Sequence, residues 1–267
     1  MIKVVQFLNN SSLLVAFAAA AICAEFQILS LGAVNPVYTM LAFSSTWLAY
    51  TFLKTNHTYD TIFWKRTSAT LFVLNLFFID RISLLFLFSA GIIVLLYSSQ
   101  LLIGTTYRFP FELRKHPVLK TTSIATCWIV ITAIVPYQAL SLQHYIAARD
   151  TALLIFSLWC LIAALSISGD ARDATIDNDK FISWPLWIGI RGTKVLMIIL
   201  LLLSVVSLFA IDNMMESQVF WPIVVYSIFA GASVLIIRPD KNWHIQTSWI
   251  DGLLIIHFVL IYFAVSV

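Results

Sequence analysis

Residues 169–180 read GDARDATIDNDK, and they interrupt a chain that is otherwise almost entirely apolar. The run on each side of this stretch is long enough to cross a bilayer, which takes about 20 mostly apolar residues in a helix. Asp170, Asp173 and Asp177 are spaced i, i+3 and i+7. A helix continued through them would therefore carry their carboxylates along one face.

The carboxylates of this stretch repel one another at close range, so they need compensation. Water, the neighbouring Arg172 and Lys180, or a divalent cation can supply it. Mg²⁺ is commonly bound by one or two carboxylates together with substrate phosphates. A metal site and a solvated polar loop between two spans both stay open at this point.

The composition is that of an integral membrane protein. Hydrophobic residues make up 61% of the 267 residues and charged residues 11%, whereas a soluble domain carries about 25% charged residues. The apolar runs are too long for barrel strands and lack a period of two, so we expect helical spans. Residues 1–267 are expected to form one all-α integral membrane domain.

We expect about nine transmembrane helices, of which the third is the shortest. The candidate spans are 12–32, 36–54, 67–80, 83–103, 118–138, 145–168, 183–210, 218–237 and 247–266.

The positive charges predict the orientation of these spans. If the N-terminus and alternate loops share one side, that side holds all of the 16 Lys and Arg residues except Arg81 and Arg149. Cytoplasmic loops carry the excess of Lys and Arg. We therefore expect a cytoplasmic N-terminus and a C-terminus on the opposite side.

A basic loop falls on the same predicted side as the acidic stretch. Residues 104–120 read GTTYRFPFELRKHPVLK and include Arg108, Arg114, Lys115 and Lys120. Such a loop is ordinary at the headgroup level, but Arg and Lys also bind phosphate oxygens well. Its position on the same side of the membrane as the aspartates modestly favours a diphosphate site.

The passage 170–194 resembles the second aspartate-rich region of the UbiA superfamily of intramembrane prenyltransferases. The matching residues are Asp170, Asp173, Asp177, Pro185, Gly189, Thr193 and Lys194. Residues 113–120, with Trp128 after them, look like the connection between the fourth and fifth helices of bacterial members. Asp251-Gly252 near the last span fits the same group.

This resemblance implies a nine-helix bundle around a central cavity in the bacterial inner membrane. It implies a prenyl diphosphate held through Mg²⁺, which leaves so that the allylic cation alkylates an aromatic or lipidic acceptor. Diphosphate departs only when its charge is neutralised, which metal ions and basic side chains achieve. The expected partners are a prenyl diphosphate or other isoprenoid lipid and membrane lipid, with no nucleic acid.

The same resemblance supplies the candidate site, without assigning a catalytic residue. The expected metal ligands are Asp170, Asp173 and Asp177, and the expected substrate-binding residues are Thr51, Thr55, Asn56, Asp60, Arg108, Arg114, Lys115, Lys120, Arg172 and Lys180.

The chain departs from the family at its first motif, NDxxDxxxD. Phe52, Thr55 and Tyr59 stand where that motif has its aspartates, and Asp60 follows one residue later. Two hypotheses stay open: a prenyltransferase with an altered first motif, and a non-catalytic homologue that binds isoprenoid lipid or scaffolds membrane enzymes. A transporter is disfavoured because charge gathers at the cytoplasmic edge rather than at the midplane.

Several polar residues lie inside the apolar runs. Ionisable residues there are expensive in lipid and usually face a partner or a cavity. We expect Glu25 to hydrogen-bond across helices, Asn75 to do the same, and His257 to be a buried bundle histidine. Cys23, Cys127 and Cys160 form no CxxC pair and are expected to be small buried apolar residues.

Overall fold

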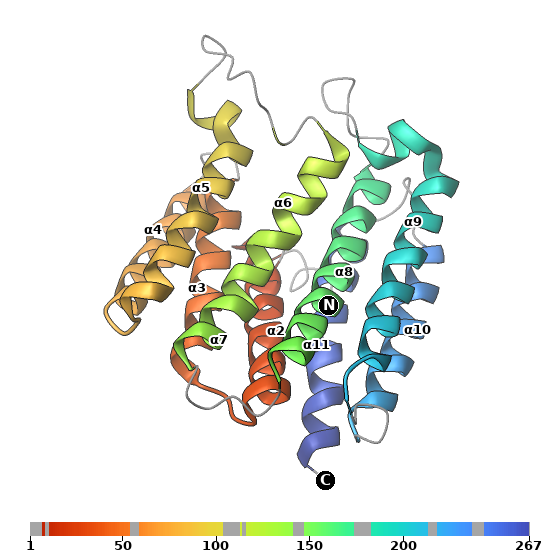
Figure 1. Cartoon of the computed structure of the whole chain (residues 1–267). Helices are drawn as coiled ribbons and strands as arrows, with labels where there is room; N and C mark the ends of the chain where they lie inside the picture. Colours follow the sequence, from red (N-terminus) through yellow and green to blue (C-terminus); the bar gives the residue numbers. More distant parts are fainter. Residues whose placement is uncertain are drawn as a thin grey trace.

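The protein is a bundle of helices that stand side by side (Figure 1). The computed structural model describes residues 7–8, 11–53, 59–103, 113, 116–140, 147–173, 183–212, 218–236 and 243–266. Within these ranges the secondary structure is helical and contains no strand. The prediction of an all-α chain is confirmed for the described residues.

The helices follow the predicted apolar runs along the chain. They are α2 (Leu13–Leu31), α3 (Pro36–Phe52), α4 (Tyr59–Leu76), α5 (Arg81–Ile103), α6 (Pro117–Ile129), η2 (Val130–Ile134), α7 (Val135–Ala139), α8 (Ala148–Asp173), α9 (Trp184–Phe209), α10 (Phe220–Ile236) and α11 (Trp243–Ser266). The largest difference is in α4, which begins at Tyr59 rather than at residue 67.

Five helical segments of the described chain are long and apolar enough to cross a membrane. They are Leu13–Leu31, Pro117–Ala139, Ala148–Ala171, Trp184–Phe209 and Ser248–Ser266. Arg81–Tyr97 and Phe220–Ile236 are apolar but shorter. These segments are consistent with the integral membrane protein that the composition predicts.

Polar side chains and prolines fix where several helices begin. Pro36 and Pro117 are first residues of their helices, where the missing N–H has no intrahelical partner to lose. The Asn35 side chain accepts a hydrogen bond of 2.9 Å from Val37 N. At α5, Asp80 Oδ1 accepts from the backbone N–H groups of Ile82 and Ser83, each at 2.9 Å.

The carboxyl group of Asp80 lies in the turn between α4 and α5. Burial alone raises the pKa of Asp80, but hydrogen bonds from the Ser83 side chain, the Ser83 and Ile82 backbone and the Tyr38 hydroxyl outweigh burial, so the pKa is lowered from its usual value. Asp80 is therefore held as the carboxylate that caps α5.

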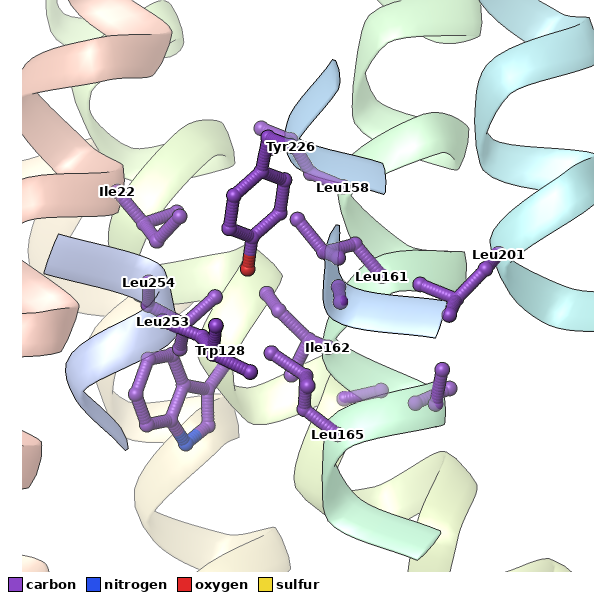
Figure 2. Close-up of a cluster of buried hydrophobic side chains, with 14 of the residues drawn as sticks. Ile22, Trp128, Leu158, Leu161, Ile162, Leu165, Leu201, Tyr226, Leu253 and Leu254 are labelled. Atoms are coloured by element: carbon purple, nitrogen blue, oxygen red, sulfur yellow. The ribbon is translucent and has the colours of Figure 1, made fainter. Parts of the chain in front are cut away.

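Helix α2 runs through the middle of the bundle and contacts α3, η2, α7 and α11. Its Ala16, Ala18 and Ala19 side chains are fully buried. Small side chains of this kind let neighbouring helices approach closely. The larger core cluster, partly shown in Figure 2, joins α2 to α6, α8, α9, α10 and α11.

Two helices depart from regular α geometry. In α6 a π-helical turn, η2, spans Val130–Ile134 just before Pro136. In α9 the backbone of Gly189 has φ 74° and ψ 162°, which breaks the helix after its first turn. A residue with a Cβ is strained at that φ, so glycine is needed there. Thr193 Oγ1 donates a 2.8 Å hydrogen bond to the Gly189 carbonyl.

The predictions for single buried residues are largely confirmed. Asn75 Nδ2 of α4 donates to Ser44 Oγ of α3 at 3.2 Å, as expected. Glu25 of α2 contacts His257 of α11, but this contact does not have the geometry of the expected hydrogen bond. Cys23, Cys127 and Cys160 are buried and free.

Candidate functional site

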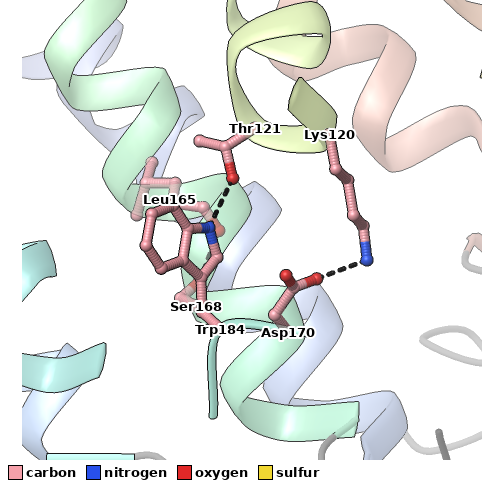
Figure 3. A network of polar contacts seen from close by, with 6 residues as sticks. All are labelled: Lys120, Thr121, Leu165, Ser168, Asp170 and Trp184. Carbon is pink, nitrogen blue, oxygen red and sulfur yellow. Dashed lines mark hydrogen bonds and ion pairs between the residues drawn. The ribbon is translucent and has the colours of Figure 1, made fainter. Parts of the chain in front are cut away.

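The candidate site begins with a buried ion pair between α6 and α8. Asp170 lies near the C-terminal end of α8 and is 4% exposed. Lys120, in the first turn of α6, places its Nζ 2.5 Å from Asp170 Oδ1 (Figure 3). One predicted metal ligand and one predicted diphosphate contact are thus brought together.

A second contact fixes the start of α9 beside this pair. The Trp184 indole N–H donates a 2.8 Å hydrogen bond to Thr121 Oγ1, the residue that follows Lys120 (Figure 3). Trp184 also lies against Trp187, with ring centroids 5.4 Å apart. The ends of α6, α8 and α9 therefore meet around Asp170.

Asp170 retains one unused acceptor that a cation could use. Its Oδ2 atom is buried and has no hydrogen-bond partner among the described residues. Helix α8 continues to Asp173, as the predicted i, i+3 spacing requires. Carboxylate oxygens are the usual protein ligands of Mg²⁺, but Asp170 is the one expected metal ligand whose side chain is described, and it is already paired with Lys120.

The other expected site residues lie mostly outside what the structure describes. Thr55, Asn56, Arg108, Arg114, Lys115, Asp177 and Lys180 fall outside the described residues, and Asp60, Arg172 and Asp173 lie on helices but their side chains fall outside the description. In the part that is described, no group of three or more His, Cys, Asp or Glu residues could hold a metal ion.

Thr51, the remaining predicted contact, is buried between α3 and α4. Its Oγ1 donates to the Trp47 carbonyl at 2.8 Å and lies 3.1 Å from Ser68 Oγ. The hydroxyl therefore already has partners that hold the two helices together.

An apolar cavity of about 140 Å³ lies between α3, α5 and α6. Its lining residues are Thr46, Ala49, Tyr50, Leu53, Ile93, Val94, Tyr97, Ser123, Ile124, Cys127, Trp128 and Ile131. Ser123 and Ile124 lie about one helical turn beyond Lys120 and Thr121 on α6. The cavity, which we call the α3–α5–α6 chamber, therefore begins about one helical turn from Lys120 along α6, and neither Lys120 nor Asp170 lines it.

The chamber was not predicted from the sequence. Its aromatic lining, Tyr50, Tyr97 and Trp128, comes from three separate apolar runs, and each residue alone looks like an ordinary membrane aromatic. The one indication in the sequence was the polar atom that each of these rings carries, because a buried Tyr or Trp usually finds a partner for that atom.

A second hollow lies at the same end of the bundle. It has a volume of about 390 Å³ and is lined by His116, Pro117, Val118, Leu119 and Trp187. The ends of α5, α6, α8 and α9 nearest Asp170 all lie on this side of the bundle, and the C-terminus lies on the other (Figure 1). The hollow and the Lys120–Asp170 pair thus lie at one end of the helices, and the chamber begins about one turn further along α6.

No protein-family model matches the chain. A search of curated proteins likewise gives no significant match.

Proposed function

We propose that the chain is a UbiA-like membrane protein with nine spans, and that it binds a prenyl diphosphate at the α6–α8 end of the bundle. The observation that supports the proposal is the α3–α5–α6 chamber, which begins about one helical turn along α6 from Lys120, the partner of Asp170. An isoprenoid diphosphate needs both features, because its tail is apolar and its head is strongly anionic.

The chamber supports the tail end of this proposal. An apolar protein cavity of about 150 Å³ stays dry and takes up benzene, and the chamber has about 140 Å³. It has room for about one isoprene unit next to the site, and a longer tail would continue into the lipid. Tyr50, Tyr97 and Trp128 are well suited to contact the double bonds of such a tail.

The ion pair supports the head end. Lys120 is a phosphate-binding type of side chain, and its carbon chain lets the ammonium group move from Asp170 to a phosphate oxygen. Mg²⁺ would be held by Asp170, with Asp173 and Asp177 as the other expected ligands, and would neutralise charge on the diphosphate. The unpartnered Asp170 Oδ2 is the atom that supports a cation here.

Two outcomes of diphosphate binding are proposed. In the first, the chain is a prenyltransferase that delivers the prenyl group to an aromatic or lipidic acceptor. In the second, it binds the isoprenoid lipid without turnover or scaffolds membrane enzymes. The second is favoured by two observations: Phe52, Thr55 and Tyr59 replace the first set of aspartates, and Lys120 already neutralises Asp170.

The test uses the purified full-length chain in lipid nanodiscs. Thermal unfolding is followed with farnesyl diphosphate, with and without Mg²⁺, for the wild type and for Asp170→Asn and Lys120→Met. We expect farnesyl diphosphate to raise the midpoint of the wild type and to raise it less in both variants. Asp212→Asn makes the same chemical change in an exposed pair with Arg149, and we expect it to bind like the wild type.

A labelled prenyl diphosphate then separates the two outcomes. Mg²⁺-dependent transfer to an aromatic or lipid acceptor, lost in Asp170→Asn, would identify a prenyltransferase. Stabilisation without product would identify a binding protein. If prenyl diphosphates of every length leave the wild type unchanged, both forms of the proposal are wrong.

A further inference from the structure

A second polar cluster lies deep in the bundle, remote from the site at α6 and α8. Glu25 of α2 and His257 of α11 are 1% and 3% exposed. The His257 Nδ1 atom lies 2.8 Å from Glu25 Oε2. Ser157 of α8 belongs to the same cluster and precedes Asp170 on that helix by thirteen residues, or about 20 Å along its axis.

Hydroxyl groups and one aromatic ring surround the pair. Ser157 Oγ lies 2.9 Å from Ser204 Oγ of α9 and also donates to the Ser204 carbonyl at 2.9 Å. The Tyr226 ring of α10 lies over the His257 imidazole, with centroids 4.1 Å apart and planes tilted by 41°. The Tyr226 hydroxyl instead points among Ile22, Leu161 and their apolar neighbours (Figure 2).

The pair leaves hydrogen-bonding capacity unused. The Glu25 carboxylate and the His257 imidazole are in contact, but their relative orientation does not make a hydrogen bond. Glu25 Oε2 and both ring nitrogens of His257 therefore have no hydrogen-bond partner within the described ranges. Buried polar atoms without partners are costly, and an internal water or ion commonly satisfies them.

A small cavity joins these atoms to the two serines. It has a volume of about 10 Å³, and its polar lining is Glu25, Ser157, Ser204, Ser227 and His257. A single water needs about 10–15 Å³ and two to four polar partners. The cavity is therefore the size of one water molecule and offers enough partners to hold it.

The charges of the pair set a limit on its protonation. A carboxylate with an imidazolium, and a carboxylic acid with a neutral imidazole, are both neutral overall and both contain one shared proton. Any other state leaves a net charge inside an apolar bundle, which is strongly unfavourable. Among the described side chains around the pair, α10 adds the Tyr226 phenol and Ser227, whereas α8 and α9 contribute serines. The face of the Tyr226 ring attracts a positive charge on the imidazole.

We propose that Glu25, His257, Ser157 and Ser204 form an intramembrane proton-binding site. The imidazole holds the shared proton as an imidazolium beside the Glu25 carboxylate, and one water molecule bridges the two groups to the serine hydroxyls. The site connects α2 and α11 with α8 and α9, so its proton and water link four helices, and α10 covers the imidazole.

Nitrogen NMR of the full-length chain in nanodiscs tests this proposal. The protein is labelled with ¹⁵N-histidine, and the His257 signals are identified by their loss in His257→Gln. In the wild type we expect these signals to stay constant from about pH 5 to 8, the range over which an ordinary imidazole changes its charge. In Glu25→Gln we expect them to shift to those of a neutral imidazole throughout this range.

Variants of α8 serve as a matched pair. Ser157→Ala removes a hydroxyl from the cavity, and we expect it to shift the His257 signals. Ser168→Ala removes an equally buried hydroxyl whose partner is the Leu165 carbonyl of the same helix, and we expect the His257 signals to stay in place. Glu25→Asp keeps the carboxylate and is expected to retain the wild-type signals.

Three results would overturn the proposal. In one, His257 of the wild type titrates like an exposed histidine, with a midpoint near about 6.5. In another, Glu25→Gln leaves the His257 signals unchanged. In the third, exchange of choline chloride for sodium chloride shifts those signals, which would identify a sodium site instead. The wild-type titration decides the question even where Glu25→Gln fails to fold.

Discussion

Removal of one member of the Lys120–Asp170 pair should destabilise the bundle. In Lys120→Met the Asp170 carboxylate keeps its burial and loses the partner of Oδ1, while Oδ2 already has no hydrogen bond from a described residue. Breaking a buried pair in this way costs about 3–5 kcal/mol. The Lys120 side chain is 18% exposed and that of Asp170 5%, so water reaches the lysine end and we expect about 3 kcal/mol.

A double-mutant cycle in detergent measures this coupling. Free energies of unfolding are compared for the wild type, Lys120→Met, Asp170→Asn and the double variant. We expect the double variant to lose clearly less than the sum of the single losses, because it leaves no unpaired buried charge. Asp212→Asn removes the same charge from an exposed pair, with side chains 66% and 74% exposed, and should change stability little. If Asp170→Asn is no more destabilising than Asp212→Asn, the buried pair does not form as described.

Three further predictions concern other parts of the molecule. The pKa of Asp80 is lowered on folding, so its stabilising contribution is present above the unfolded pKa and is lost as the pH falls through the lower folded pKa. The stability of Asp80→Asn should therefore fall less than that of the wild type over this acidic range. Identical dependence of stability on pH in the two proteins would contradict the prediction. Ala49→Phe should fill the α3–α5–α6 chamber and abolish stabilisation by farnesyl diphosphate. Ala230→Phe changes an equally small, fully buried residue of α10, which does not line the chamber, and should lower stability without a specific loss of binding. Equal binding by Ala49→Phe and wild type would count against the chamber. Reporter fusions should place the N-terminus in the cytoplasm and the C-terminus outside it, and the reverse result would invalidate the orientation expected from Lys and Arg.

The positions of most helices could be predicted from hydropathy alone. Long apolar runs in a chain with few charges leave little alternative to helices, because every backbone polar group in lipid needs a partner within the chain. Helix α4 is the element whose start hydropathy did not predict. Its first turns, which include Asp60, Lys65 and Arg66, are polar, so an apolar window found only the later part of the helix.

The site was predictable only in part. The aspartates and basic residues were identified by residue type. Lys120 and Asp170, however, are 50 positions apart, and nothing in the sequence indicates that they pair. The chamber could not be predicted because it depends on which faces of α3, α5 and α6 meet, and their residues are almost uniformly apolar. Glu25 and His257 were each expected to be buried, but their pairing depends on α2 and α11 lying side by side.

The π-turn η2 has a consequence for how α6 tolerates insertions and deletions. A π-turn accommodates one more residue than an α-helical turn, so it offsets the two halves of the helix by one position, or about 100° of rotation. Trp128 faces the chamber before this offset, and Val135 is fully buried after it. Deletion of a single residue within Val130–Ile134 would restore regular helical geometry. Either Trp128 would then turn out of the chamber, or Val135 would turn out of the core toward lipid.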